Sequence, residues 1–297
     1  MPIIRDDSRS LQPEHSEAFM EFRGTALPLS NDGFDQALGI LAVRAPEVWA
    51  VVAVETGGCG FLRDRRPLIL FERHIFHRRT AGAFAAAHPA ISAPSAGGYL
   101  GGVREYERLA EAVVLNRAAA LESASWGLGQ IMGFNAGAAG FQTAAAMVSA
   151  MIDHEDVQVI AMANFLRSRK LHVPLAAHDW AAFARAYNGP GYAKNQYDAR
   201  LAAAYRQFKG GPLPDLLVRQ VQVFLTFLGI DPGRIDGVPG KRTRSGVVQF
   251  REQQGMPSTD RIDAALLAAL VAAVGAAVQE GRPRAPDQGA ISRRLGK

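Results

Sequence analysis

The stretch KGGPLP at residues 209–214 constrains the fold of this chain more than any other feature. Two adjacent glycines and two prolines within one short segment disfavour both helix and strand, so the segment is typical of a linker. A chain of 297 residues has room for a medium-sized and a small domain on either side of such a break. We therefore predict a first domain over 34–208, a linker over 209–214 and a second domain over 215–276. The polar segment 1–33 either packs on the first domain or is loose, and 277–297 is predicted to be a flexible tail.

Apolar residues recur at helical spacing on both sides of the linker, often within alanine-rich blocks that favour helices. In the first domain we predict helices over 34–42, 46–55, 103–121, 124–132, 142–169, 179–187 and 194–208. A short hairpin is expected between them, with its turn at 64–66 and its return strand at 68–71, and 80–102 is rich in loop residues. Three further helices are predicted over 215–228, 240–254 and 262–276. The fold class is therefore mainly α: an α+β domain with one small hairpin, followed by a small three-helix domain.

Composition narrows the possible partners. The formal net charge of +5 suits an anionic polymer such as a bacterial cell wall, while the chain has no dense basic run or nucleic-acid fingerprint, so we expect no nucleic-acid partner. No apolar stretch is long enough for stable membrane insertion, and the N-terminus lacks a signal-peptide pattern. The single cysteine, Cys59, excludes a disulfide framework and a cysteine-based zinc site. We expect a monomer with no metal and no cofactor.

Glu55 closes an apolar helix in the stretch VVAVETGGCG, just where two glycines end it. A carboxyl group in such a place is partly removed from water, and the helix C-terminus carries a partial negative charge. Both effects favour the protonated form of the carboxyl and raise its pKa. A raised pKa is what a general acid needs at neutral pH, so Glu55 is a candidate catalytic acid.

Three other segments supply residues suited to binding a sugar polymer. SWGLGQIMGFN contains Trp126 and Gln130, FARAYNGPGYAKNQY contains Tyr187 and Asn188, and ILFERHIF places Glu72 at the end of the predicted return strand. Glycine-containing corners allow a polymer to approach the backbone, while aromatic and amide side chains offer stacking faces and hydrogen bonds. We predict that Trp126, Gln130, Tyr187 and Asn188 bind substrate.

The order of these segments resembles the lysozyme superfamily, especially goose-type lysozymes and lytic transglycosylases. More closely, VETGGCGF, PLILFERHIF, SASWGLGQIMGFN and FARAYNGPGYAKNQYDARLAAAY are similar to the N-acetylmuramidase domain of phage endolysins, over residues 34–208. The resemblance implies a lysozyme-like fold. It also implies that Glu55 protonates the β-1,4 bond between N-acetylmuramic acid and N-acetylglucosamine.

A second carboxylate would activate a water or stabilise positive charge on the sugar. The candidates are Glu72 and Asp64, which lies in the predicted hairpin turn between two arginines. Several relatives work with one clearly assigned glutamate, so a third option is that no side chain fills this role.

Residues 216–270 are similar to the three-helix peptidoglycan-binding domain found beside many cell-wall hydrolases. The match rests on the pattern D-G-x-x-G-x-x-T…F, and its candidate wall-binding residues are Asp236, Gly237, Thr243 and Phe250. Pro239 stands where that family usually has an aromatic residue, and Arg251 replaces a usual glutamine. These departures leave the fold prediction intact but weaken the prediction of ligand affinity.

The combined hypothesis is a modular endolysin that is held in the host cytoplasm until lysis and then acts on the cell wall. Two alternatives stay open. One is a lytic transglycosylase, which would yield 1,6-anhydro sugars. The other is a non-catalytic peptidoglycan-binding phage structural protein, which would bind the wall without clearing a cell suspension.

Overall fold

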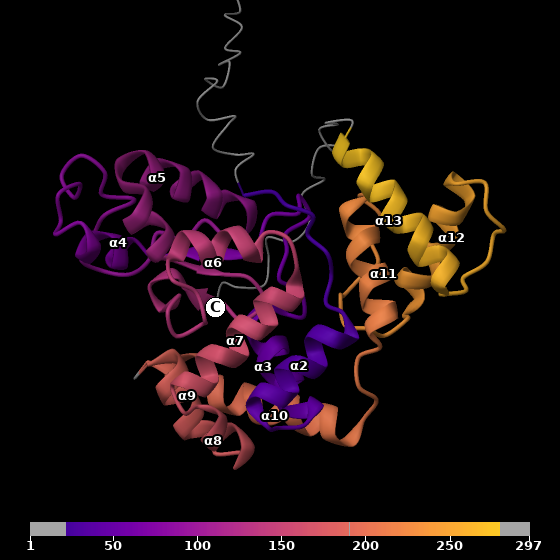
Figure 1. Ribbon diagram of the computed structural model, residues 1–297, viewed down its shortest axis with the longest axis horizontal. Helices are drawn as coiled ribbons and strands as arrows, with labels where there is room; N and C mark the ends of the chain where they lie inside the picture. Colours follow the sequence, from indigo (N-terminus) through magenta and orange to yellow (C-terminus); the bar gives the residue numbers. More distant parts are fainter. Residues whose placement is uncertain (1–21, 190, 280–297) are drawn as a thin grey trace, which may run out of the picture. The chain divides into compact units, whose positions relative to one another are not determined.

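The computed structural model describes residues 22–189 and 191–279. These residues belong to two compact units that divide between Leu213 and Pro214 (Figure 1). The division falls within the predicted linker, although helix α10 (Tyr197–Gly210) continues into its first residues. Each unit is described separately below.

The first unit, which ends at Leu213, begins with two helices whose ends follow from local chemistry. Helix α2 (Asn31–Leu41) starts after Ser30, whose hydroxyl accepts a hydrogen bond from the Gly33 amide. Helix α3 (Ala45–Thr56) has a proline in its first turn and ends at Gly57, which has a left-handed φ of 67°. Six consecutive residues of α3, 47–52, are buried, so this helix lies in the core. Both predicted helices are confirmed.

The only sheet in the described residues is small and antiparallel, with the order β1-β2-β3. Its strands are β1 (Ile69–Phe71), β2 (Ala124–Trp126) and β3 (Ile131–Met132), and Ile69 pairs with Trp126, which in turn pairs with Ile131. The predicted helix over 124–132 is therefore wrong. Positive φ angles at Gly127 (65°) and Gln130 (46°) turn the chain back on itself, which a helix does not allow.

The predicted hairpin around Asp64 is present in reduced form. Phe61 and Pro67 form an antiparallel bridge, and the Leu62 amide donates to the Arg66 carbonyl across the turn. The return strand continues as β1, but its partner is β2, which lies far along the sequence. The return strand of the hairpin thus belongs to a three-stranded sheet whose other two strands come from a segment that the sequence pattern had assigned to a helix.

The remaining helices of this unit follow the prediction with three changes, one of which is the unpredicted short helix α8 (His172–Ala176). The predicted helix 142–169 is divided around His154, which pairs with Leu27 and caps the following helix through its ring. A short helix directly after Glu72 had not been predicted. The elements are α4 (Arg73–Arg79), η1 (Gly102–Arg104), α5 (Glu105–Glu122), η2 (Gly133–Asn135), α6 (Ala144–Met151), α7 (Glu155–Ser168), α8 (His172–Ala176), α9 (Trp180–Asn188), η3 (Tyr192–Asn195) and α10.

The part of the N-terminal segment that the structure describes packs on the first unit. The Phe22 ring lies 5.6 Å from the rings of both Tyr106 and Trp126, and Ala26 and Leu29 are fully buried. Residues 1–21 of this segment lie outside the described residues. Helix α3 packs along α10, which also contacts α9 (Figure 1), and these three helices position the site described below.

The second unit contains α11 (Leu216–Phe227), α12 (Lys241–Gln253) and α13 (Ala264–Gln279), as predicted. Asp215 caps α11 by accepting from the Leu217 amide at 2.8 Å. The core of the second unit includes Val221, Leu225 and Phe250. Helix α13 extends beyond the predicted domain end at 276, and the rest of the predicted tail, 280–297, lies outside the described residues.

Across the described residues of both units, no single helix combines the length and hydropathy needed to cross a membrane. Helices α2 and α3 meet those criteria only when they are taken together, and they are bent by 107° relative to each other.

Candidate active site

Glu55 lies in the last turn of α3, at the point where the core helix ends. Gly57 and Gly58 follow it with φ angles of 67° and 108°, values that residues with side chains rarely adopt. The Tyr197 hydroxyl, at the start of α10, donates a hydrogen bond to Glu55 Oε1. Arg200, one turn further along α10, donates to the Val54 carbonyl at 3.0 Å. The end of α3 is thus attached to the start of α10 by two contacts, one to the Glu55 carboxyl and one to the backbone just before it.

Burial raises the pKa of the Glu55 carboxyl from 4.5 to about 7. The hydrogen bond from Tyr197 and the positive charge of Arg200 both favour the carboxylate and lower this pKa, but burial outweighs them. At neutral pH the group is therefore present in both its protonated and its charged form. Such a carboxyl can donate a proton to a substrate and recover it afterwards.

A column of aromatic rings extends from Glu55 into α9. The Tyr187 ring stacks on Phe183 at 5.4 Å and faces Tyr197 at 6.4 Å, with interplanar angles of 12° and 13°. The Tyr187 hydroxyl donates to the Gly129 carbonyl at 2.5 Å, and burial raises the pKa of this phenol well above its usual value. Tyr187 therefore connects α9 to the turn between β2 and β3. Asn188, the exposed last residue of α9, comes next in the chain.

The β2–β3 turn is closed by Gln130. Its amide nitrogen donates to the carbonyls of Leu68 and Gly127 at 3.1 and 2.9 Å, and its amide oxygen accepts from the Ser125 hydroxyl at 2.8 Å. Both ends of this amide are thus engaged within the protein, and a role in substrate binding stays a prediction.

Trp126 lies in the core rather than on the surface. Its side chain is 0% exposed, and its indole nitrogen donates to the Leu121 carbonyl at 3.1 Å. The expectation that Trp126 contacts a sugar is corrected by this position, because a fully buried ring offers no stacking face.

The two candidate second carboxylates have different surroundings. Asp64 forms a two-point ion pair with Arg66, at 2.7 Å to Nε and 2.6 Å to the terminal nitrogen. Arg66 is 2% exposed and its guanidinium lies 4.0 Å from the Tyr106 ring centroid. Asp64 therefore neutralises a buried cation, which is a structural role.

Glu72 ends β1 and precedes α4, as the sequence predicted. The Tyr99 hydroxyl donates to its two oxygens at 2.9 and 3.1 Å, and the His74 ring lies 3.1 Å from one of them. Burial, followed by the bond to Glu72, raises the pKa of Tyr99 to about 12, so the phenol stays a donor at neutral pH. The Tyr99 side chain is 45% exposed, which leaves this cluster open to a ligand.

In the second unit, the predicted wall-binding residues surround a buried glutamine. The Gln222 oxygen accepts from the amides of Asp236 and Gly237 at 3.1 and 2.9 Å, and its nitrogen donates to Thr243 at 3.2 Å and to Asp236 at 3.3 Å. Thr243 and Phe250 are each 1% exposed. The expectation that these two side chains bind the wall is corrected by their burial: they build the loop and the core. A wall contact by Asp236 and Gly237 stays a prediction.

Comparison with known proteins decides the family. The family model described as N-acetylmuramidase matches residues 44–209, and the model described as a putative peptidoglycan binding domain matches residues 215–270. The chain belongs to the N-acetylmuramidase family. The crystal structure of the Burkholderia AP3 phage endolysin is similar to it, at 39% identity and a TM-score of 0.58, covering 67% of this chain and 78% of that one. No curated protein sequence matches.

These matches confirm the resemblance stated above. The protein is a modular muramidase, a glycoside hydrolase of peptidoglycan, with a C-terminal peptidoglycan-binding domain. Within the described residues, no three His, Cys, Asp or Glu side chains are grouped to hold a metal.

Sequence reasoning missed three residues of this muramidase. Tyr197 and Arg200 hold the end of α3 beside Glu55, and their signal was a pair spaced i, i+3 at the start of the helix after AYNG. Gln222 was missed because a glutamine in a largely apolar helix gives little indication of a buried hydrogen-bonding centre.

Proposed function

We propose that this muramidase hydrolyses the β-1,4 bond between N-acetylmuramic acid and N-acetylglucosamine, with Glu55 as the general acid. The observation that carries the proposal is the pKa of about 7, raised by burial, in a carboxyl at the end of a core helix within the matched region. A carboxyl that is half-protonated near neutrality supplies the proton that the leaving sugar oxygen requires.

The partners of Glu55 define its role in the reaction. Tyr197 donates to Oε1, so Oε2 is the oxygen that carries the transferable proton. The proton moves from Oε2 to the glycosidic oxygen while positive charge develops at the anomeric carbon. The carboxylate left behind is stabilised by the same Tyr197 hydroxyl and by the charge of Arg200.

For the second carboxylate we propose Glu72 in preference to Asp64. Asp64 is engaged in a two-point ion pair with the buried Arg66, and using it in catalysis would break that buried pair. Glu72 faces the partly exposed Tyr99, whose hydroxyl can orient the carboxylate toward a water or toward the charged sugar ring.

The second domain supports this activity by holding the enzyme at an insoluble substrate. Linking a binding domain to a catalytic one raises the effective concentration of the catalytic site at the polymer. The formal charge of +5 adds attraction to an anionic wall. By analogy with the phage endolysin, we propose that the enzyme accumulates in the host cytoplasm and reaches the wall at lysis.

The test compares wild type with Glu55→Gln on outer-membrane-stripped Gram-negative cells, followed by mass spectrometry of the released fragments. Glu107→Gln, an exposed carboxylate on α5, is the matched control. Hydrolysis predicts clearing by wild type and the control, fragments with reducing muramic acid ends, and a folded but inactive Glu55→Gln. Fragments with 1,6-anhydro ends would instead assign the lytic transglycosylase reaction. Equal clearing by the folded Glu55→Gln variant would refute the role of Glu55.

A further inference from the structure

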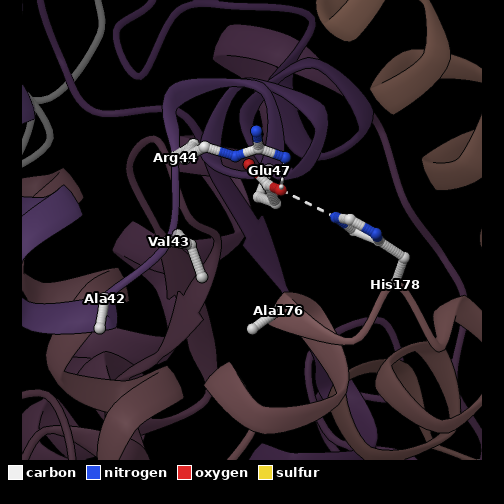
Figure 2. Close-up of a pocket in the computed structure, with 6 residues that line it drawn as sticks. All are labelled: Ala42, Val43, Arg44, Glu47, Ala176 and His178. Atoms are coloured by element: carbon white, nitrogen blue, oxygen red, sulfur yellow. Dashed lines mark hydrogen bonds and ion pairs between the residues drawn. The ribbon is translucent and has the colours of Figure 1, made fainter.

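A pocket of about 250 Å³ lies at the opposite end of α3 from Glu55. It is formed by the connection between α2 and α3, the first turn of α3 and the segment that joins α8 to α9. Figure 2 shows the side chains of Arg44, Glu47 and His178 gathered on one side of it, opposite small apolar residues. The lining residues are Ala42, Val43, Arg44, Glu47, Ala176 and His178. The reaction proposed above uses none of them.

Glu47 is a buried carboxylate with one oxygen unsatisfied. Its side chain is 4% exposed, and its Oε1 lies 2.8 Å from His178 Nε2 and 3.7 Å from an Arg44 nitrogen. Its Oε2 is buried and has no hydrogen-bond partner among the described residues. A buried oxygen without a partner is unfavourable, and a donor from a ligand would satisfy it.

The neighbours of Glu47 hold it in place and add a positive charge at the rim. His178 has a left-handed φ of 56°, and its ring packs against Tyr205 at 4.2 Å and Trp180 at 5.5 Å. Arg44 precedes α3, and its side chain is 72% exposed. The pocket therefore presents a buried carboxylate inside and an exposed guanidinium at its edge. This pair is complementary to a group that carries both an ammonium and a carboxylate.

The size of the pocket limits the ligand. Sites for drug-sized molecules usually exceed about 300 Å³. The space beside Glu47 is therefore suited to a single head group rather than to a sugar ring with its substituents. A zwitterionic α-amino-acid group has both the size and the two charges that the pocket requires.

The same three helices connect this pocket to the candidate active site. Helix α3 carries Glu47 in its first turn and Glu55 in its last, an axial rise of about 12 Å. Helix α10 runs back along it, from Tyr197 beside Glu55 to Tyr205 beside His178. An extended peptide spans about 3.3–3.6 Å per residue, so a peptide attached near the cleaved bond covers this distance within three to four residues.

We propose that the Glu47–Arg44 pocket binds the zwitterionic end of the diamino-dicarboxylic acid in a stem peptide of the wall. Glu47 accepts from the ammonium and Arg44 pairs with the carboxylate. The proposal rests on the proposed function, because the stem peptide is attached to the muramic acid whose bond Glu55 cleaves. It makes the enzyme selective for glycan that bears peptides with a free amino-acid end.

Binding is measured by calorimetry in the full chain carrying Glu55→Gln, so that no turnover occurs. The probes are a disaccharide-tripeptide that ends in diaminopimelate, its N-acetylated form, and the peptide-free disaccharide. We expect Glu47→Gln to weaken binding of the first probe about tenfold and to leave binding of the peptide-free disaccharide unchanged. When Glu47 is left unchanged, N-acetylation of the first probe should weaken its binding by a similar factor. Arg44→Gln should also weaken binding of the first probe, and because Arg44 is exposed this variant is expected to fold normally.

Glu111→Gln provides the matched control, because Glu111 also pairs with a histidine, His88 at 2.6 Å, on a different part of the unit. It should bind all three probes as the parent does. The proposal is overturned if acetylation leaves binding unchanged, or if Glu47→Gln weakens the peptide-free disaccharide equally, which indicates a structural role alone. Failure of the proposed function would show separately, as a wild-type enzyme that releases no fragments from the wall.

Discussion

Replacing Glu55 with Gln should stabilise the catalytic unit by an amount that depends on pH. Burial raises the pKa of Glu55 from 4.5 to about 7 in the folded state. As pH rises through this interval, the unfolded chain loses the proton before the folded chain does, so the folded state loses stability relative to the unfolded one. The loss is complete above about pH 7 and amounts to about 3 kcal/mol. Glutamine keeps the shape of the side chain and an oxygen for Tyr197, but it never ionises.

The tryptophans of this chain make the measurement specific to one unit. The sequence has 3 Trp, at positions 49, 126 and 180, and all precede the boundary at Leu213. Tryptophan fluorescence during urea unfolding of the full chain therefore reports the catalytic unit alone, although the two-domain chain does not unfold in one step.

We expect the stability gain of Glu55→Gln over wild type to be small at about pH 4, to grow between about pH 4.5 and 7, and to reach about 3 kcal/mol at about pH 8.5. Glu107→Gln, which replaces an exposed carboxylate, should show no such change with pH. A gain that is the same at both ends of this range, or a loss of stability at high pH, would refute the burial argument and with it the basis for Glu55 as the acid.

Three further variants test other parts of the structure. Tyr197→Phe removes a hydrogen bond that lowers the pKa of Glu55, so the alkaline limb of the pH–rate profile for kcat/KM should move to higher pH, by about one unit; an unmoved limb contradicts this role. Asp64→Asn removes the ion pair that Asp64 forms with the buried Arg66 and should reduce the stability of the catalytic unit by about 3 kcal/mol, with kcat largely retained. Phe250→Ala should destabilise the second domain by about 3–5 kcal/mol in calorimetry without shifting the tryptophan-detected transition.

The sequence predicted the helices well where local chemistry sets their ends. Helix α3 is the clearest case, because Pro46 suits its first turn and Gly57 its end. The segment 124–132 failed for a physical reason. Trp126 in β2, Leu128 in the turn and Ile131 in β3 are all buried, and so short an apolar run does not distinguish a buried strand from a buried helix.

The sequence nominated the central residue of the candidate site but not the residues around it. A glutamate at the end of an apolar helix is common, so Glu55 could be selected only because three further motifs follow it in the order that resembles the N-acetylmuramidase family. Tyr197 could not be selected in the same way, because its role depends on the antiparallel packing of α10 against α3, which brings together residues 142 positions apart. Trp126 was misassigned because an aromatic residue beside glycines is equally suited to a core and to a sugar platform.

The two carboxylates of α3 show how a core helix can contribute to polar chemistry. The residues 48–52 that lie between them are all apolar and buried, so the middle of the helix offers no polar side chain to a ligand. Each end of the helix carries one carboxyl group, and the two groups are accommodated in different ways. Glu47 pairs with His178, whereas Glu55 is held protonated up to about pH 7. Helix α10 contributes to both sites, because Tyr197 donates to Glu55 at one end and the Tyr205 ring packs on His178, the partner of Glu47, at the other.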